Sequence, residues 1–434
     1  MLLIYSHTIT NRLKYIFKTI FVDVLLVKIE FTTDVQFFEN FEGVKINYSD
    51  SKLNTGLFFQ TSRLLFENTI QKQKIELTNF EGKPSFFSVG NDALFPFDVF
   101  AASFYLISRY EEYLPHKQDV HERFLGEQSL AVQHNFIEEP LVNYWINHLV
   151  EIIENAYPNF KFPNRTFEFV STLDIDNAYA YQHKGFVRTI GALTKALLKG
   201  NNFSNRLKVL FGNSKDPYDT FDYQTEIHTK YNISPIYFFL IGDYGKYDKN
   251  IPYNNKTFQN LIQSVSKKNE IGIHPSYASN NNSEKIGIEK DRLHTISKKE
   301  IKQSRQHYLK LNLPKTYNNL IENKITVDHT MGYAEYPGFR ASICSPYYFY
   351  NLEQEKETSL QLFPFTTMEA TFQYYQKSSP EKALEKILEL MQKVKNVSGT
   401  FISVWHNESL SNEGIWKGWK IVYEKMLKES QNKD

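Results

Sequence analysis

Residues 166–434 are predicted to form an α/β fold with parallel strands, because two observations agree. Short apolar runs rich in β-branched and aromatic residues alternate with helical stretches, and several of these runs end directly before an Asp or a His. Strands that alternate with helices run parallel and are joined by right-handed crossovers. The predicted strands are 167–173, 234–241, 270–273, 360–365 and 400–405, and the predicted helices are 220–231, 288–295, 314–322 and 380–394.

Residues 1–165 are predicted to form a separate, smaller α+β domain of unknown role. A strand is expected at 44–48, and helices are expected at 97–113 and 141–157. Two proline-containing turns within 157–164 mark the boundary to the following domain, 166–434. At 434 residues the chain is long enough for two to three domains.

The composition excludes several classes of protein. A formal net charge of +1 gives no basis for binding nucleic acid. The sequence has no phosphate-binding or dinucleotide glycine motif and no Gly-x-Ser-x-Gly elbow, which disfavours nucleotide, nicotinamide and serine-hydrolase chemistry. The single cysteine, Cys344, excludes a disulfide within the chain and a cysteine-based zinc site. It suits a reducing compartment and is expected to be a small buried side chain.

An apolar stretch at 19–27 is too short for a signal peptide or a spanning helix. Asp23 interrupts it, and three basic residues precede it. A signal peptide needs a longer apolar region with a cleavage site, and a spanning helix needs about 20 apolar residues. We expect an amphipathic helix that runs into a strand, in a cytoplasmic protein that associates at most peripherally with the membrane.

A basic insertion at 177–215 interrupts the predicted α/β pattern. It has no acidic residue, and apolar residues are interleaved with the basic ones. One interpretation is a solvated helical excursion. The other is a contact, through 184–215, with an anionic membrane surface or with the phosphates of a lipid-linked substrate. The basic residues are Lys184, Arg188, Lys195, Lys199, Arg206, Lys208 and Lys215.

Candidate chemical groups follow directly after predicted strands. Asp174 and Asp176 follow the predicted strand 167–173, and His274, His307 and His406 follow the predicted strands 270–273, 303–306 and 400–405. In parallel α/β folds the carboxyl ends of the strands meet at one edge, which carries the active site. These side chains are therefore expected to converge.

The two aspartates, two residues apart, face the same way if the chain there is extended. Because adjacent carboxylates repel, one is best held by a cation, so one ligand and one general base are plausible roles; helix capping or a turn is the alternative. A histidine such as His274 is either a zinc ligand or structural. Arg305 could hold a carboxylate, and His406 is placed to act as a general acid.

The ordered motifs resemble the NodB-type polysaccharide deacetylases of carbohydrate esterase family four, over about residues 166–430. Residues 1–165 resemble the uncharacterised domain that precedes this catalytic domain in one bacterial branch. The resemblance implies a distorted (β/α) barrel of about seven strands. The motifs are TLDID at 172–176, EIGIH at 270–274, SRQHY at 304–308, LFP at 362–364 and VWH at 404–406, with FDVFAA at 97–102 and SRYEEYL at 108–114 in the first domain.

Roles follow from the resemblance by position. It implies that Asp174 is the general base, that Arg305 tethers this base, and that His406 is the general acid. It also implies that Asp176 and His274 bind the metal.

The sequence departs from the family pattern at two places. Ile175 splits the usual Asp-Asp pair, and Ala278 stands where a second ligand histidine is expected, four residues after the first. His307 is the natural substitute as third ligand, because it follows the next strand.

Four further residues are expected near the substrate: Tyr277, Arg340, Trp405 and Glu369, of which Glu369 would tune the general acid. The resulting hypothesis is metal-dependent hydrolysis of an N-acetyl group from a sugar or glycan. The expected cofactor is one divalent metal, with zinc as the first choice and cobalt, manganese, nickel or iron as others. The alternatives are an amidase or deaminase on the same barrel, or a silent glycan-binding protein.

Overall fold

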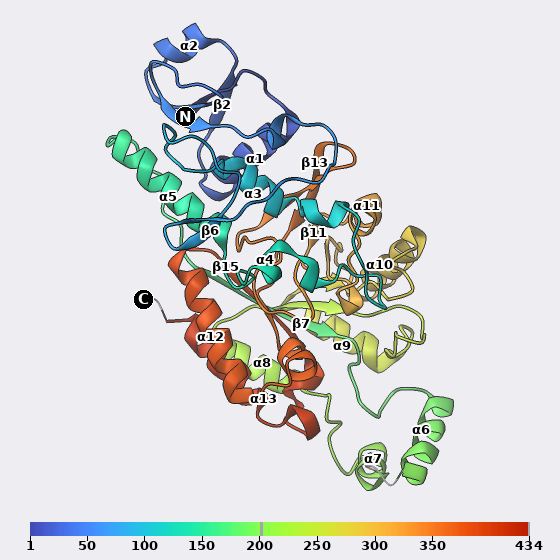
Figure 1. Ribbon diagram of the computed structural model, residues 1–434. Coiled ribbons are helices and arrows are strands. Elements are labelled where there is room, and N and C mark those ends of the chain that lie inside the picture. The colour runs from blue at the N-terminus through green and yellow to red at the C-terminus, as the bar shows by residue number, and fades with distance from the viewer. Residues whose placement is uncertain (200–202, 433–434) are drawn as a thin grey trace.

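The structure is a computed structural model that describes residues 1–199 and 203–432 (Figure 1). Its larger sheet has nine strands in the order β12-β13-β11-β10-β9-β8-β7-β15-β14. β12 runs antiparallel to β13, and the other neighbours are parallel. The strands are β7 (Glu168–Ile175), β8 (Ile236–Phe239), β9 (Glu270–Ile273), β10 (Gln303–Ser304), β11 (Val327–Asp328), β12 (Tyr347–Asn351), β13 (Lys356–Leu362), β14 (Thr367–Met368) and β15 (Thr400–His406).

Helices connect the parallel strands and lie around the sheet (Figure 1). Each presents an apolar face to the sheet, as in α12, where Ala383, Ile387, Leu390 and Val394 are buried at helical spacing. The α/β fold predicted for this part of the chain is therefore confirmed. The helices are α8 (Phe221–Lys230), α9 (Lys256–Ser266), α10 (Ser283–Ser297), α11 (Lys315–Glu322), α12 (Pro380–Asn396) and α13 (Trp419–Ser430).

The larger sheet is strongly curved. Arg305, which follows β10, donates hydrogen bonds to Thr172 and Asp174 on β7, although β9 and β8 lie between these strands. Three strand spacings in a flat sheet would separate β10 from β7 by about 14 Å, farther than an arginine side chain reaches. The predicted count of about seven strands is not confirmed. Among the described residues no ladder joins β14 to β12 or β13, so closure of a barrel is not seen.

The first part of the chain builds a second, four-stranded parallel sheet in the order β2-β1-β3-β4. The expected strand at 44–48 is present as β3, and the helix expected at 97–113 ends early and continues as a 3-10 turn at Tyr110–Tyr113. The domain boundary near residue 165 stays a prediction. The elements are β1 (Leu2–Tyr5), α1 (Asn11–Phe17), β2 (Ile29–Thr32), α2 (Val35–Asn40), β3 (Val44–Ser49), β4 (Leu57–Gln60), β5 (Thr78–Phe80), β6 (Lys83–Ser85), α3 (Val99–Ile107), α4 (Leu130–Gln133) and α5 (Leu141–Ala156).

The apolar stretch at 19–27 is largely buried in the core. It forms a π-helical turn, Lys18–Val24, that continues α1 and leads to β2, with Ile20 and Phe21 fully buried. Cys344 is likewise buried, as expected. Within the described ranges, none of the helices combines the length and the apolarity needed to span a membrane.

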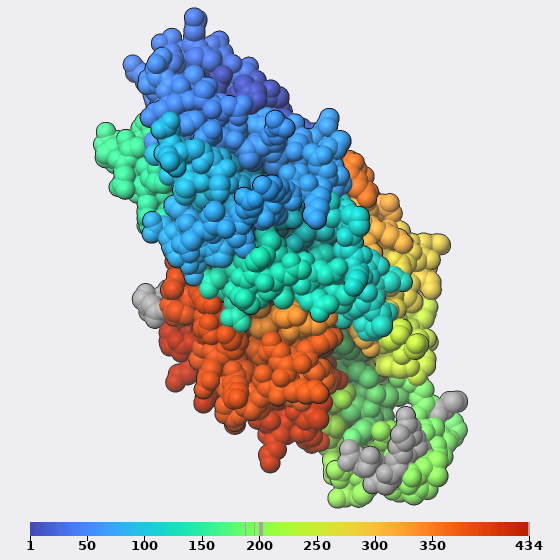
Figure 2. Space-filling view, viewed as in Figure 1, coloured from blue at the N-terminus to red at the C-terminus, as the bar shows by residue number. Residues whose placement is uncertain are grey.

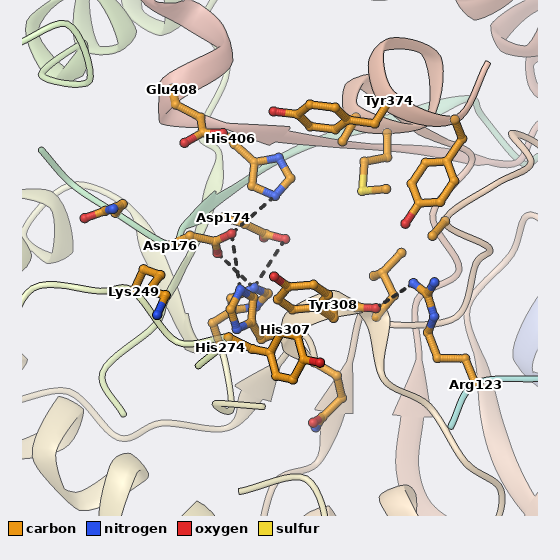
Figure 3. A pocket seen from close by; sticks show the side chains of 18 residues that line it. Arg123, Asp174, Asp176, Lys249, His274, His307, Tyr308, Tyr374, His406 and Glu408 are labelled. Carbon is orange, nitrogen blue, oxygen red and sulfur yellow. Dashed lines mark hydrogen bonds and ion pairs between the residues drawn. The ribbon is translucent and has the colours of Figure 1, made fainter. Parts of the chain in front are cut away.

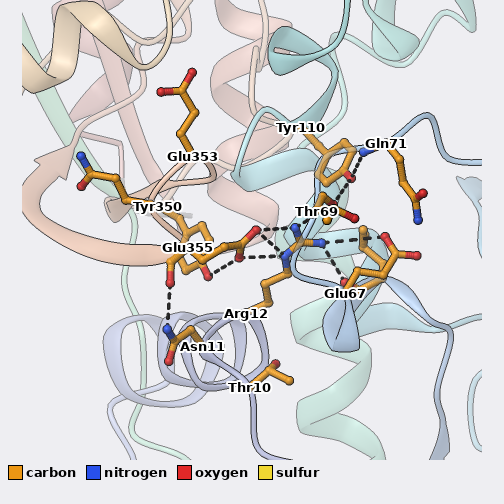
Figure 4. Close-up of polar contacts among 12 residues, drawn as sticks. Thr10, Asn11, Arg12, Glu67, Thr69, Gln71, Tyr110, Tyr350, Glu353 and Glu355 are labelled. Carbon is orange, nitrogen blue, oxygen red and sulfur yellow. Dashed lines mark hydrogen bonds and ion pairs between the residues drawn. The ribbon is translucent and has the colours of Figure 1, made fainter.

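Buried charges join the first part of the chain to the larger sheet. Arg12 on α1 donates through Nε to Glu355 Oε2 at 3.0 Å, in the turn between β12 and β13 (Figure 4). It also donates to the carbonyl oxygens of Leu64 and Thr69, and Tyr350 donates to the same carboxylate at 2.9 Å. One continuous apolar core also runs through both parts.

A second buried network lies at the same junction. Glu112 accepts hydrogen bonds from Arg109 Nε at 2.7 Å and from Arg340 at 2.9 and 2.6 Å. Arg109 also donates to the Arg340 carbonyl and to the Tyr333 hydroxyl. Burial raises the pKa of Glu112, but Arg340 and Arg109 outweigh burial and lower it to about 2. Glu112 is therefore the carboxylate that neutralises two buried guanidinium groups.

Replacing Glu112 with glutamine is expected to lower the free energy of unfolding by about 3–5 kcal/mol at neutral pH, because buried Arg340 loses its carboxylate partner and buried Arg109 keeps only Glu111. The folded pKa lies below the ordinary value of 4.5, so the stabilisation is fully present above pH 4.5 and is lost as the pH falls toward 2. Urea denaturation at several pH values measures both effects. Glu76→Gln, in an exposed ion pair, should leave stability unchanged; equal stability of the two variants would contradict the prediction.

Candidate functional site

A cavity of about 400 Å³ opens at the carboxyl ends of the parallel strands. β7 and β15 pair in register so that Asp174 lies beside His406, and β9 continues the same edge toward His274. Figure 3 shows the side chains of Asp174, Asp176, His274, His307 and His406 converging in this cavity. The structure thus brings together all five groups that the sequence placed after strands.

Asp176, His274 and His307 form a cluster suited to a metal ion. His274 Nε2 lies 3.2 Å from Asp176 Oδ1, and His307 Nε2 lies 3.4 Å from Asp176 Oδ2. One candidate ligand atom of each residue lies within 4.8 Å of the others. Two imidazoles and one carboxylate are a typical catalytic zinc set that leaves a position open.

The outer nitrogen of each ring is held in place. His274 Nδ1 lies 2.6 Å from the Arg305 carbonyl oxygen, and His307 Nδ1 lies 2.8 Å from Asp248 Oδ1. With the proton on Nδ1, each Nε2 presents a lone pair toward Asp176, as in metal-binding histidines. Asp176 Oδ1 is buried and has no hydrogen-bond donor among the described residues. These residues therefore fit a divalent cation.

The electrostatics of the cluster also favour a positive charge. Burial lowers the pKa of His307, but Asp176 and Asp248 outweigh burial and raise it to about 9. Burial raises the pKa of Asp176, yet the two histidines hold it well below its usual range. A bound cation would take the place of the proton that the carboxylates attract.

Asp248 is a functional candidate that the sequence did not reveal. It lies in the loop after β8, and its carboxylate accepts hydrogen bonds from the backbone N–H groups of Tyr277 at 2.8 Å and Ala278 at 3.3 Å. The expected second ligand histidine is missing at Ala278, and the backbone there instead orients Asp248, which in turn orients His307. No sequence motif marks Asp248.

Asp174 is tethered on one oxygen. Arg305 Nη1 donates to Asp174 Oδ1 at 2.9 Å and to Thr172 Oγ1 at 2.7 Å, while Arg305 Nε donates to the His329 carbonyl at 3.0 Å. The guanidinium also lies over the Phe238 ring, 4.7 Å from its centroid. Arg305 is fully buried and thus holds a buried carboxylate that lines the cavity.

His406 is held by Glu369. His406 Nδ1 and its backbone N–H both lie 2.8 Å from Glu369 Oε1, and Nε2 lies 3.9 Å from Asp176 Oδ2. Burial lowers the pKa of His406, but the charge and hydrogen bond of Glu369, followed by the charges of Asp176 and Asp174, raise it well above the ordinary value. The neighbouring carboxylates therefore favour the protonated form of the ring, and its Nε2 faces Asp176.

Other residues predicted near the substrate lie outside the cavity lining. Trp405 is buried against Trp419 and Tyr423, because neighbouring residues on a strand face opposite ways. Arg340 is buried with its guanidinium engaged by Glu112, so it cannot reach a ligand in the cavity. Tyr277 packs against Tyr247, which does line the cavity, at 4.2 Å between ring centroids.

One residue of the first part of the chain, Arg123, lines the cavity, which the sequence did not predict. Arg123 lines the cavity and donates to the Tyr308 carbonyl at 2.9 Å (Figure 3). The His121 ring packs against Tyr308 at 5.0 Å between centroids. Tyr374, Tyr375, Lys249 and Glu408, from the second part of the chain, also line the cavity. These contacts depend on how two segments that are distant in the sequence pack together, so no local sequence pattern predicts them.

Comparison with known proteins gives one family model and several solved structures. A family described as of unknown function (DUF7033) matches residues 2–158. No curated protein matches the chain. The polysaccharide deacetylase of Mycobacterium smegmatis is 13% identical, with 63% of this chain and 87% of that chain covered and a TM-score of 0.42.

Two further structures match at similar levels. The allantoinase PuuE is 10% identical over 61% of this chain and 84% of that chain, with a TM-score of 0.40. A polysaccharide deacetylase of Pseudomonas aeruginosa PAO1 is 9% identical, with the same coverages and a TM-score of 0.40. Polysaccharide deacetylases are thus among the structures that this chain resembles, and an additional family model covers its first part, as the sequence motifs predicted.

Proposed function

We propose that the protein removes the N-acetyl group of a sugar or glycan by hydrolysis, with one divalent metal held by Asp176, His274 and His307. The observation that carries this proposal is the arrangement of three ligand atoms between a tethered carboxylate, Asp174, and a proton-donating imidazole, His406. Zinc suits this ligand set best. The motif resemblance to the deacetylase family supports the choice of an acetamide as the bond that is broken.

The protein groups have distinct roles in this mechanism. When bound, the cation would polarise the amide carbonyl and lower the pKa of a water. Asp174 accepts the proton of the attacking water, and Arg305 and Thr172 keep its carboxylate in place. The Arg305 contact occupies Oδ1, so Oδ2 is the oxygen available for the proton.

The leaving group needs a proton of its own. His406 donates from Nε2 to the amine nitrogen as the C–N bond breaks, and Glu369 keeps the ring protonated beforehand. The products are acetate and a free amino sugar. Amide hydrolysis needs one group that takes a proton from water and another that gives a proton to the leaving amine. Asp174 and His406, on either side of the proposed ligands, supply these two groups.

The division into domains 1–165 and 166–434 and the barrel-like form of the second belong to the same proposal. The curvature that lets Arg305 reach Asp174 supports a barrel-like sheet. It brings groups from β7, β9, β10 and β15 to a single cavity.

Acetate release from N-acetylglucosamine oligomers tests the proposed function. The full-length protein with added zinc is expected to release acetate and an equal amount of free amine, to stop when a chelator removes the metal, and to recover when zinc is restored. Metal binding without acetate release would contradict it. Hydrolysis of a small cyclic amide in place of the oligomers would point to an amidase, and glycan binding without turnover to a silent site.

A further inference from the structure

A helical arm extends from the catalytic edge of the barrel. It comprises α6 (Phe186–Lys199) and α7 (Phe203–Leu210), which protrude from the body of the molecule (Figures 1 and 2). The arm begins at Asn177, which follows Asp176 directly and lines the cavity. Its base is fixed by Asp216, whose carboxylate accepts from the backbone N–H groups of Ala180 and Tyr181 at 2.6 and 2.8 Å.

The arm exposes large apolar side chains. Phe186, Ile190 and Leu197 are spaced by four and seven residues, which places them on one face of α6. They are 80%, 43% and 64% exposed, and Leu198 is 86% and Phe211 of the following turn 76% exposed. An amphipathic helix normally turns this face toward the core. Here the face looks outward, and contiguous exposed apolar side chains mark an interaction site.

The charge of the arm identifies the partner. Between residues 177 and 215 the chain has seven Lys and Arg residues and no Asp or Glu, and of these Lys215 is paired with Asp219 and Asp222. Arg188 ties α6 to the body by donating to the carbonyls of Lys249 and Asn250 and lies over the Tyr244 ring. A helix with a Phe- and Leu-rich face and a basic polar composition is typical of segments that lie in the interface of an anionic bilayer.

We propose that the α6–α7 arm docks on an anionic lipid bilayer, with Phe186, Ile190, Leu197, Leu198 and Phe211 entering the boundary between headgroups and acyl chains. Since the arm starts at the cavity, docking would hold the catalytic edge close to the bilayer surface. A lipid-linked N-acetylated glycan would then be presented directly to the cavity; this last step rests on the proposed function, whereas the docking itself does not.

Co-sedimentation of the full-length protein with vesicles tests the docking. Wild type is expected to bind vesicles of phosphatidylcholine with about one third phosphatidylglycerol, and to bind pure phosphatidylcholine at least about tenfold more weakly. The double variant Leu197→Ser, Leu198→Ser is expected to lose at least about tenfold in binding to the anionic vesicles. Lys208→Glu should weaken binding too, and high salt should weaken it in wild type.

The matched control is Val120→Ser, which removes an apolar side chain that is 87% exposed on the first part of the chain. It should bind anionic vesicles like wild type. Failure of wild type to bind, or unchanged binding by the double variant, would overturn the proposal. If wild type is a dimer and the double variant is a monomer, the apolar face of the arm binds a second copy of the chain instead.

The result is independent of the proposed function, because the binding assay uses no substrate. Acetate release from a soluble N-acetylated oligomer should be the same in the double variant as in wild type, since the replaced residues lie outside the cavity lining. Circular dichroism and an unchanged melting temperature establish that the variant is folded, as expected for exposed positions.

Discussion

The variant Asp174→Asn is expected to lose about 10²–10⁴-fold in kcat/KM for acetate release, with the metal content unchanged. Asparagine can still accept the Arg305 hydrogen bond through its side-chain oxygen, so the local structure persists. The asparagine side chain cannot take a proton from water, so the attack of water on the amide loses its general base. Steady-state kinetics and metal analysis by mass spectrometry on the same preparation separate the two effects.

The control for this variant is Asp328→Asn. Asp328 is also buried and ends β11, another strand of the same sheet, but its carboxylate accepts hydrogen bonds from Ser304 and Thr330 and does not line the cavity. Its replacement should change stability more than turnover. Turnover of Asp174→Asn at the wild-type rate would remove Asp174 from the mechanism.

The second large effect concerns the metal. Wild type is expected to hold about one divalent ion per chain after dialysis against zinc, and His307→Ala should bind it more than about 100-fold more weakly, because the third ligand is gone. The metal affinity of Asp248→Asn should lie between those of wild type and His307→Ala. A loss of about 10–100-fold is typical when a residue that orients a metal ligand is replaced. Competition with a chromogenic chelator measures all three affinities.

His121→Ala serves as the control for His307→Ala. His121 packs against Tyr308, next in sequence to His307, but does not belong to the cluster of ligand atoms. It should keep the wild-type affinity. If His307→Ala keeps the metal as well, the third ligand is another residue, and the substitution of His307 for the histidine expected at position 278 is wrong.

The sequence predicted well which polar side chains meet at the carboxyl edge of the sheet, because strand and motif coincide there. The apolar runs before Asp174, His274 and His406 are long enough to be recognised as strands, and their polar ends must meet when the strands are parallel. In contrast, β10, β11 and β14 have two residues each, which is too few to show any periodicity. The number of strands could therefore not be predicted from the sequence.

Long-range partners were beyond the reach of local patterns. Arg340 was expected near the substrate, but it pairs with a carboxylate, Glu112, that lies 228 residues earlier in the chain. Arg123 lines the cavity and Asp248 orients His307, and both come from loops without a motif. Such contacts are decided by packing between distant elements, which one sequence does not reveal.

The position of Arg123 in the cavity lining has a thermodynamic consequence. A ligand that contacts Arg123 and His307 together binds fully only when the segment around Arg123 is packed against the loop that carries Tyr308. By linkage, occupancy of the cavity stabilises that packing, and a partner that binds the packed arrangement more tightly than the unpacked one raises ligand affinity by the factor by which the ligand raises its own. The first part of the chain can therefore influence ligand affinity at a site to which it contributes no proposed catalytic or metal-binding group.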